Sequence, residues 1–194
     1  MKKKCRIGVF GGSFDPVHCG HIELADNSLK ELSLDKVIFV PAKIPPHKLH
    51  KRLSPLKHRL AMLKAALKPH VRFSVSRYEL NRRGTTFTYK TLGYFRKFFK
   101  NADLFLIIGS DSLNDISSWK NLPEILRSAE IITGIRKGFE VHVSPKLRNE
   151  VHILKKPIAG ISSSEIRRLV RNKVSVEKLV PKGVFTYLAK HAIY

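Results

Sequence analysis

The sequence predicts an α/β fold in which a doubly wound, mostly parallel sheet carries helices on both faces. Two observations lead to this fold class. Apolar, β-rich runs alternate along the 194 residues with segments of helical periodicity. Several of these runs, such as Leu104–Ile108, are apolar without strict alternation, as strands covered on both faces should be. Ligands in such sheets bind beyond the carboxyl ends of the strands, so residues that follow strands deserve the closest reading.

The first half of the chain opens with the strand Arg6–Phe10, which ends at two glycines. The segment from His21 to Leu32 then spaces its apolar residues as an amphipathic helix does. A later helix, Ser54–Leu67, begins with a serine cap and a proline at the first helical position. The other predicted elements of this half are the strands Lys36–Pro41 and Val71–Ser76 and the helix Thr88–Phe99.

The second half contains the most apolar predicted strand, Asp103–Asp111. With no repeat, no low-complexity linker and 43% hydrophobic residues, residues 1–194 are expected to form a single domain with a substantial hydrophobic core. The other predicted elements are a helix at Leu122–Glu130, strands at Glu130–Arg136 and Val151–Pro157, and helices at Ser162–Asn172 and Val180–Ile193.

The charge of the chain is strongly basic, with 37 Lys and Arg against 15 Asp and Glu, a formal net charge of +22. This balance favours anionic partners, namely nucleic acids, acidic lipids or phosphorylated small molecules, although a solvated basic surface explains many of these side chains equally well. The longest apolar run is too short to span a bilayer. The basic start runs straight into glycines, and two cysteines give no disulfide framework, so we expect a cytoplasmic protein that is neither exported nor membrane-bound.

Gly11 and Gly12 directly follow the first predicted strand, in the stretch GGSFDPVHCGH. Glycines there allow positive φ and let an anion approach exposed amides. The stretch is not a dinucleotide fingerprint, because the third glycine is missing and the second strand ends in Pro41-Ala42-Lys43 without the acid that would hold a ribose. No Gly-Lys-Ser/Thr follows, which excludes a P-loop. Taken alone, a purely structural turn stays possible.

His18 and His21 lie one helical turn apart after these glycines, so both side chains can point back over the turn. Imidazole donors there could hold phosphate oxygens as charge builds in a transition state. A zinc site would need a third ligand, and Cys19 points elsewhere on the helix. Two capping histidines without chemistry remain the plain alternative.

The stretch ISSSEIRR follows Gly160 and begins a helix. Its serines offer amides and hydroxyls at the positive end of the helix dipole, and Arg167 adds a forked donor, a combination suited to phosphates. A serine cap with Glu165 in a capping box would explain one serine only.

Asp111 and Trp119 follow the most apolar predicted strand. Asp111, just past Gly109, could bind a nucleotide or cap a helix. Trp119 could stack on a flat ring or belong to the core.

Together these motifs resemble one family. GGSFDPVHCGH, with its His18-x-Gly20-His21 core, and ISSSEIR are similar to the two signatures of the α/β nucleotidyltransferase superfamily, the first of which class I aminoacyl-tRNA synthetases share. The similarity to the bacterial nicotinate-nucleotide adenylyltransferases runs nearly end to end. It departs at Ser164, where the family often has threonine, at Lys120, where relatives can carry an aromatic residue, and at Ala42. The further similar stretches are PAKIPPHK (41–48), RYELNRRGTTFTYKTL (77–92), LIIGSDSLNDISSW (106–119) and LVPKGVFTYLAKHAIY (179–194).

The resemblance implies a Rossmann-like nucleotidyltransferase fold and transfer of the adenylyl group of ATP to nicotinate mononucleotide, giving deamido-NAD and pyrophosphate in NAD biosynthesis. The transfer would be in line, without a covalent intermediate, and Mg²⁺ would arrive with ATP rather than at a protein metal site. By motif, the catalytic residues would be His18 and His21. ATP would be bound by Gly11, Gly12, Ser13, Phe14, Asp15, Gly109, Asp111, Ser163, Ser164 and Arg167, and nicotinate mononucleotide by Thr88, Trp119, His47 and Lys48.

Two alternatives stay open from the sequence. One is another transferase of the superfamily that acts on nicotinamide mononucleotide or phosphopantetheine. The other is a nucleic-acid-binding protein or synthetase-like fragment, suggested by the +22 charge. No KMSKS-like segment, anticodon-binding extension or aromatic-studded basic face supports the second, so no nucleic-acid partner is expected. An oligomer is compatible with the sequence.

Overall fold

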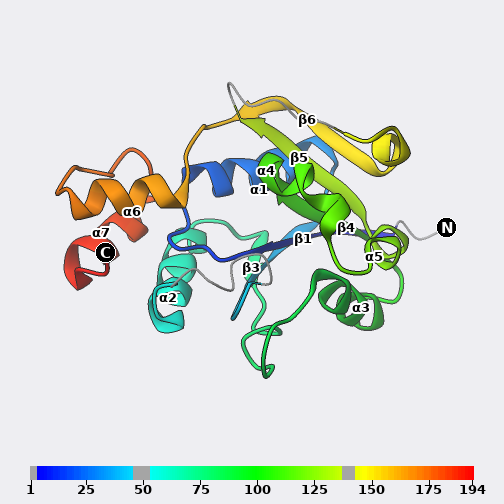
Figure 1. The fold of residues 1–194 in the computed structure, drawn as a ribbon, viewed down its shortest axis with the longest axis horizontal. Helices are drawn as coiled ribbons and strands as arrows, with labels where there is room; N and C mark the ends of the chain where they lie inside the picture. The colour runs from blue at the N-terminus through cyan, green and yellow to red at the C-terminus, as the bar shows by residue number, and fades with distance from the viewer. Residues whose placement is uncertain (1–3, 46–52, 137–142) are drawn as a thin grey trace.

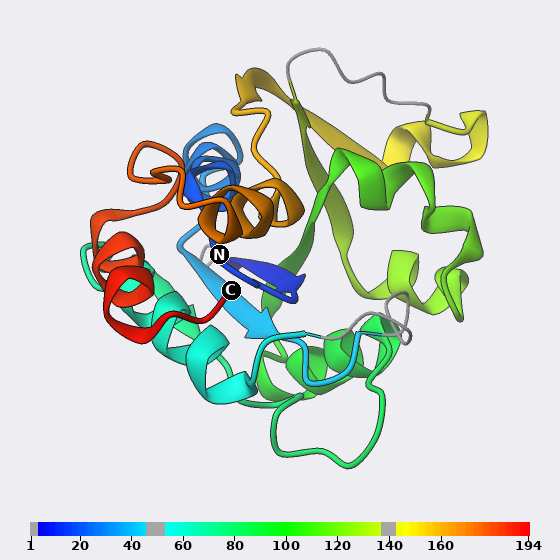
Figure 2. The same ribbon diagram turned by 60° about the vertical axis from the view of Figure 1, so that its left-hand side comes forward.

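The computed structural model describes residues 4–45, 53–136 and 143–194, and its strands form a six-stranded sheet of order β3-β2-β1-β4-β5-β6 (Figures 1 and 2). Every neighbouring pair is parallel. The chain runs outward from β1 to β3, returns to β4 beside β1, and runs outward again to β6. Strand order therefore reverses between β1 and β4, which confirms the predicted doubly wound sheet and locates its ligand-binding edge.

The helices and strands follow the predicted order closely, with the largest shifts at their ends. The strands are β1 (Cys5–Gly12), β2 (Lys36–Pro41), β3 (Phe73–Val75), β4 (Ala102–Gly109), β5 (Glu130–Arg136) and β6 (Val151–Ile158). The helices are α1 (Cys19–Glu31), α2 (Leu56–Leu67), α3 (Thr88–Phe98), α4 (Ser110–Asn114), α5 (Leu122–Ser128), α6 (Ser163–Arg171) and α7 (Lys182–His191), with short 3-10 helices η2 (Ile116–Ser118) and η3 (Pro145–Glu150).

The two faces of the sheet carry separate cores because successive strand residues point in opposite directions. Phe10 of β1 and Phe105 of β4 pack on one face with residues of α1, α2, α6 and α7. Val9 and Leu106, one position along in each strand, pack on the other face with residues of α3, α4 and α5. In Figure 2 the C-terminal helices α6 and α7, in orange and red, lie beside α1 and α2. This arrangement brings the C-terminus beside the turn that follows β1, where the Tyr194 hydroxyl donates to Asp15.

Two local predictions were wrong at element ends. The predicted strand Asp103–Asp111 stops at Gly109, and the next two residues already begin α4. Ser54 does not cap α2. Pro55 holds the cap position with an extended ψ of 137°. The reason lies in tertiary contacts, because the amide of Ser54 donates to the Asp15 carboxylate at 3.1 Å and its carbonyl accepts from Arg59 Nε at 3.1 Å.

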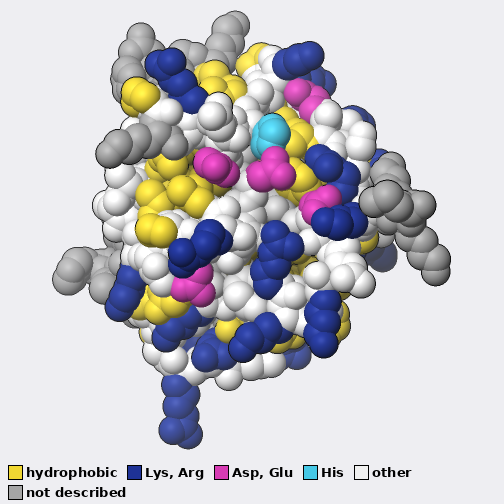
Figure 3. Space-filling view, turned by 90° about the vertical axis from the view of Figure 1, so that its right-hand side faces the viewer, with side chains coloured by type: hydrophobic (Ala, Val, Ile, Leu, Met, Phe, Trp, Pro, Cys, Tyr) yellow, Lys and Arg dark blue, Asp and Glu magenta, His cyan; other side chains and the backbone are white. Residues whose placement is uncertain are grey.

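The basic side chains of the molecule do not gather into a single groove on the face that carries α3 and α5. Figure 3 shows Lys and Arg side chains spread over this face with acidic side chains among them. Some are engaged locally: Lys36 Nζ lies 4.4 Å from the centroid of the Phe99 ring, and Arg96 donates to two backbone carbonyls. The net charge on this face therefore belongs to a dispersed surface rather than to a defined polyanion site.

Candidate active site

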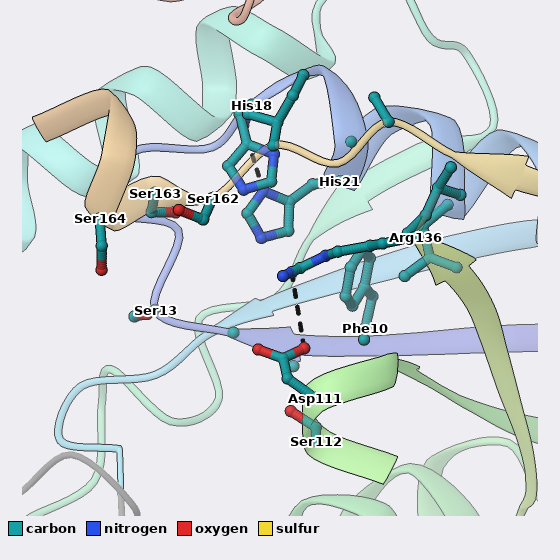
Figure 4. A pocket seen from close by; sticks show the side chains of 18 of the residues that line it. Phe10, Ser13, His18, His21, Asp111, Ser112, Arg136, Ser162, Ser163 and Ser164 are labelled. Carbon is teal, nitrogen blue, oxygen red and sulfur yellow. Dashed lines mark hydrogen bonds and ion pairs between the residues drawn. The ribbon is translucent and has the colours of Figure 1, made fainter. Parts of the chain in front are cut away.

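Two adjoining cavities open at the carboxyl ends of β1 and β4, where the order of the strands reverses. We call the first the histidine cleft because His18 and His21 line it (Figure 4). It brings together ten of the predicted residues from four separate segments. The predicted residues that line it are Gly11, Gly12, Ser13, His18, His21, Gly109, Asp111, Ser163, Ser164 and Arg167.

The turn after β1 does not use a positive φ at the glycine pair, contrary to the prediction. Gly11 and Gly12 continue the strand, and the positive φ lies at Phe14 instead, at 45°. A Cβ on Gly12 would come within 3.0 Å of the Phe14 ring, so the glycine makes room for that ring. Phe14 in turn packs edge-on against Phe10, with ring centroids 5.5 Å apart. The bare backbone of the pair forms part of the cleft wall.

The rings of the two histidines lie close together and tilted at the start of α1. His18 holds the cap position, its ring centroid lies 3.7 Å from that of His21, and the two planes differ by 32°. The backbone N–H of His18 donates to Nδ1 of His21 at 3.2 Å. Because Nδ1 of His21 accepts this bond, the proton of the neutral ring resides on Nε2. Gly20 keeps the pair close to β6, since a Cβ there would lie 3.2 Å from the carbonyl oxygen of Ala159.

His18 is held uncharged by its surroundings. The residue is only 3% exposed, and burial, with a smaller contribution from the Arg136 charge, lowers its pKa to about 3. Its Nδ1 is buried without a hydrogen-bond partner among the described residues. The sequence left the protonation state of this ring open, and the structure favours the neutral imidazole at neutral pH.

Arg136 and Asp111 face each other across the cleft (Figure 4). Their closest N–O distance is 3.6 Å, and the arginine side chain is the more buried of the two. Asp111 does not cap α4, because Gly109 holds that position. Arg136 was not predicted as a site residue, although it ends β5 at the same edge of the sheet that drew attention to Asp111. Its place at a strand end was the signal that could have found it.

The N-terminus of α6 closes the cleft opposite the sheet. Ser162 caps the helix by accepting from the amide of Glu165 at 3.1 Å, so the alternative of a serine cap is correct for that one residue. The hydroxyl of Ser163 donates to the carbonyl of Pro16 at 2.9 Å. The first amides of a helix have no acceptor within the helix, and here they lie at the cleft.

Arg167 joins α6 to the turn after β1. Its Nη1 donates to the carbonyl of Asp15 at 2.7 Å, and its Nη2 donates to the Ser164 hydroxyl at 3.1 Å. A guanidinium has five N–H donors, so these two bonds fix its orientation and leave donor capacity for an anion. The side chain of Arg167 thus joins the ISSSEIR stretch to the GGSFDPVHCGH stretch, through a bond between residues 152 positions apart in the chain.

Phe14 and Asp15, predicted to bind ATP, do not reach the cleft wall. Both are 1% exposed. The Asp15 carboxylate accepts from the amide of Ser54 at 3.1 Å and from the hydroxyl of Tyr194 at 2.9 Å. These contacts give the two residues a supporting position behind the turn. Sequence spacing cannot distinguish a side chain in the wall from one directly behind it.

Arg59 is a second supporting residue that the sequence did not indicate. It is 2% exposed, and its Nη1 donates to the carbonyls of Ser13 and Ala42, both at 2.8 Å. The loop after β1 and the loop after β2 are therefore held at a fixed separation by one buried guanidinium.

The second cavity, which we call the tryptophan pocket, shares Gly11–Ser13 and Ser112 with the histidine cleft. Trp119 and Thr88, both predicted, line it together with Thr86 and Glu79, which were not predicted as site residues. Apolar side chains of the strands and α3 supply much of its remaining wall: Val9, Leu92, Leu106 and Ile108. His47 and Lys48, predicted to cover the substrates, lie outside the described residues.

The described residues contain no group of three His, Cys, Asp or Glu side chains placed to hold a metal ion. Asp111 is the one carboxylate among the described residues that line the histidine cleft. No helix within the described ranges is long and apolar enough to cross a membrane.

The chain is similar to known proteins over most of its length. Residues 9–169 match the cytidylyltransferase-like family. Over their full lengths, the chain is 35% identical to a protein of Clostridium tetani described as a probable nicotinate-nucleotide adenylyltransferase. It is 39% identical to a protein of the same description from Clostridium perfringens strain SM101, with 100% of this chain and 98% of that one covered.

The fold is also found in a solved structure, the Plasmodium falciparum nicotinic acid mononucleotide adenylyltransferase complexed with NaAD. The TM-score is 0.81 at 20% identity, covering 98% of this chain and 97% of that one. At this identity the likeness concerns the fold, and it agrees with the strand order described above.

Proposed function

The chain belongs to the nicotinate-nucleotide adenylyltransferases, within the cytidylyltransferase-like family, and we propose that the histidine cleft and the tryptophan pocket together form its active site. The reaction joins the adenylyl group of ATP to nicotinate mononucleotide, which forms nicotinate adenine dinucleotide and releases pyrophosphate. It is a step of NAD biosynthesis. The observation that carries the site assignment is the meeting of the histidine pair, the α6 N-terminus and Arg167 around one cleft.

In the proposed mechanism a 5′-phosphate oxygen of nicotinate mononucleotide attacks the α-phosphorus of ATP. The bond from that phosphorus to the bridging oxygen breaks, and pyrophosphate leaves with the electron pair. Such a transfer needs positioning and charge neutralisation rather than a covalent protein intermediate. The donors around the histidine cleft suit that demand.

His18 and His21 act at the α-phosphate in this proposal. The hydrogen bond from the His18 amide fixes the His21 ring so that its Nε2 carries the donor proton. A fixed donor can meet the oxygen on which charge develops without reorganising. Burial keeps His18 neutral, so its contribution is a ring donor and the orientation of its neighbour rather than a full positive charge.

The β- and γ-phosphates are assigned to α6 and the arginines. The amides of the first turn of α6 and the Ser163 and Ser164 hydroxyls offer donors, and Arg167 brings a positive charge already oriented by Asp15. Arg136 adds a second positive charge from β5. Pyrophosphate is thus met by donors on both sides of the cleft.

The nicotinate ring is assigned to the tryptophan pocket, where Trp119 offers a flat apolar surface and Thr86 and Thr88 offer hydroxyls. Mg²⁺ would enter with ATP and neutralise phosphate charge. One carboxylate, Asp111, fits an ion that is held mainly by phosphate oxygens and water.

A cytoplasmic location stays a prediction, with which the free thiols of Cys5 and Cys19 are compatible.

Steady-state kinetics of pyrophosphate release with ATP and nicotinate mononucleotide test the site. His21→Ala should lower kcat by roughly 10²–10³-fold, the usual cost of removing a transition-state donor. His152→Ala is the matched control, because His152 pairs with Glu130 on the exposed side of β6 and lines neither cavity. Near-normal turnover of a folded His21→Ala enzyme would rule out the catalytic role proposed for that residue.

The acceptor is tested in the same assay by replacing nicotinate mononucleotide with nicotinamide mononucleotide or 4′-phosphopantetheine. We expect the highest kcat/KM with the nicotinate compound. A clear preference for either replacement would contradict the acceptor assignment.

A further inference from the structure

The tryptophan pocket contains one ionisable side chain among its described lining residues, and it is an acid, Glu79. This is unexpected for a pocket assigned to the ring of an anionic acceptor. The other polar side chains of the described lining are uncharged, namely threonine and serine hydroxyls and the indole of Trp119. Any charge on Glu79 would therefore act on the bound ring without a cation in the described wall to offset it.

The side chain of Glu79 has one hydrogen-bond partner among the described residues. Its Oε1 accepts from the hydroxyl of Thr91 in α3 at 2.7 Å, and the residue is 8% exposed. Burial raises the pKa of its carboxyl to about 7, while the bond from Thr91 opposes that shift. Near neutral pH this carboxyl thus exists in both its protonated and its ionised form.

The charged groups on neighbouring segments are bound elsewhere. Lys43, after β2, donates to the backbone carbonyl of Arg82 at 2.9 Å. Lys90 of α3 lies 6.0 Å from the Tyr89 ring centroid. Lys120, beside Trp119, lies 4.8 Å from the Phe87 ring centroid. On the segment of Glu79 itself Arg77, Arg82 and Arg83 are exposed, and none of these cations forms an ion pair with Glu79.

We propose that Glu79 is a specificity-determining residue of the tryptophan pocket, which admits the carboxylate of nicotinate when the Glu79 carboxyl is protonated and opposes it when that carboxyl is ionised. The inference rests on the proposed function, because it requires the acceptor ring to occupy this pocket. Two carboxylates in one poorly solvated pocket cannot both be ionised without mutual repulsion. A neutral carboxamide meets no such repulsion, and its N–H groups can donate to an ionised Glu79.

The consequence is a change of acceptor preference with pH. Binding of the nicotinate ring is coupled to a proton on Glu79, so KM for nicotinate mononucleotide rises as pH increases through about 7. Nicotinamide mononucleotide has the same ribose and phosphate. The ratio of the two KM values, acid over amide, therefore cancels titration of the phosphate and reports the ring substituent alone.

The experiment measures this ratio at saturating ATP from pH 6 to 9 for the wild type, Glu79→Gln and Glu177→Gln. The last is a control, since Glu177 is exposed and lines neither cavity. We expect the ratio to rise at least threefold across this range in the wild type and the control, and to stay flat in Glu79→Gln. A flat wild-type ratio, or an unchanged slope in a folded Glu79→Gln enzyme, overturns the proposal.

Thr91→Val supplies a second test that leaves the acid in place. Removing the hydroxyl that stabilises the ionised carboxylate should move the rise of the ratio to higher pH. An unmoved midpoint contradicts the proposal even where Glu79→Gln does not fold. Absence of dinucleotide with either acceptor in the wild type would instead overturn the proposed function, so the two failures are distinguishable.

Discussion

The histidine cleft and the tryptophan pocket share the Gly11–Ser13 wall but are built from opposite chemistry. The cleft gathers Arg136, Arg167 and a helix N-terminus, all of which favour negative charge. The pocket offers apolar side chains, neutral hydroxyls and one buried acid. The contrast indicates a division of labour, in which charge is rearranged in the cleft while the pocket selects the shape and charge of the acceptor.

Among the variants that separate the two cavities, Arg136→Met should give the largest effect, and this effect should be confined to the histidine cleft. We expect kcat/KM for ATP to drop about a hundredfold, because a charged donor to the phosphates is lost. The pKa of His18 should rise from about 3, since the Arg136 charge helps to lower it. Kinetics and proton NMR titration of His18 measure the two effects.

Arg127→Met is the control for that variant, because Arg127 is exposed on α5 and lines neither cavity. Equal losses in the two variants would mean that overall charge, rather than the position of Arg136, supports binding.

The effect of Trp119→Ala should be confined to the tryptophan pocket. Loss of the stacking surface is expected to raise KM for nicotinate mononucleotide about tenfold, equivalent to about 1.4 kcal/mol, with kcat within a factor of about two. Initial rates at varied acceptor and saturating ATP measure the effect, and Trp119→Phe should recover much of it. A fall in kcat at unchanged KM would show that the two cavities are not functionally separate.

The smallest expected effect is on stability and concerns the hydrogen bond from Tyr194 to Asp15 behind the histidine cleft. Tyr194→Phe removes the hydroxyl that donates to the Asp15 carboxylate at 2.9 Å and should lower the free energy of unfolding by about 1 kcal/mol. Urea denaturation measures the change. Tyr78→Phe is the matched control, because that hydroxyl donates to a backbone carbonyl in an exposed bond and its loss should cost less. An equal or larger cost in the control would assign Tyr194 no special supporting role.

The fold was predictable because the central strands, such as β2 and β4, are largely apolar runs and the longer helices have an apolar period. The ends were less predictable. Ser54 has the sequence of a helix cap, yet its amide is bound by Asp15, a contact across 39 residues that no local pattern records. Likewise, the positive φ expected at the glycine pair lies at Phe14, because the packing of its ring decides where the turn is made.

The candidate site was predictable wherever a residue directly follows a strand or opens a helix. His21, Asp111 and Ser163 were found in this way, whereas Arg136, the last residue of β5, was missed although it lies at the same edge of the sheet. Glu79 neither directly follows a strand nor opens a helix, since it lies in a turn after β3 and its importance depends on burial, which only the packing of α3 against that turn reveals. Sequence reasoning thus reached most of the site residues at the strand ends and missed Glu79, which tertiary contacts bring to the pocket wall.

The bond from Arg167 to the carbonyl of Asp15 spans 152 residues, and the bond from Ser163 to Pro16 spans 147. Contacts of such separation form late, because a long loop must close before they are made. A chain that leaves the ribosome amino end first can pair β1 through β5 while α6 is still unsynthesised. The nascent protein would then have most of its sheet but no phosphate-facing helix, and its capacity to hold ATP would arise in one late step.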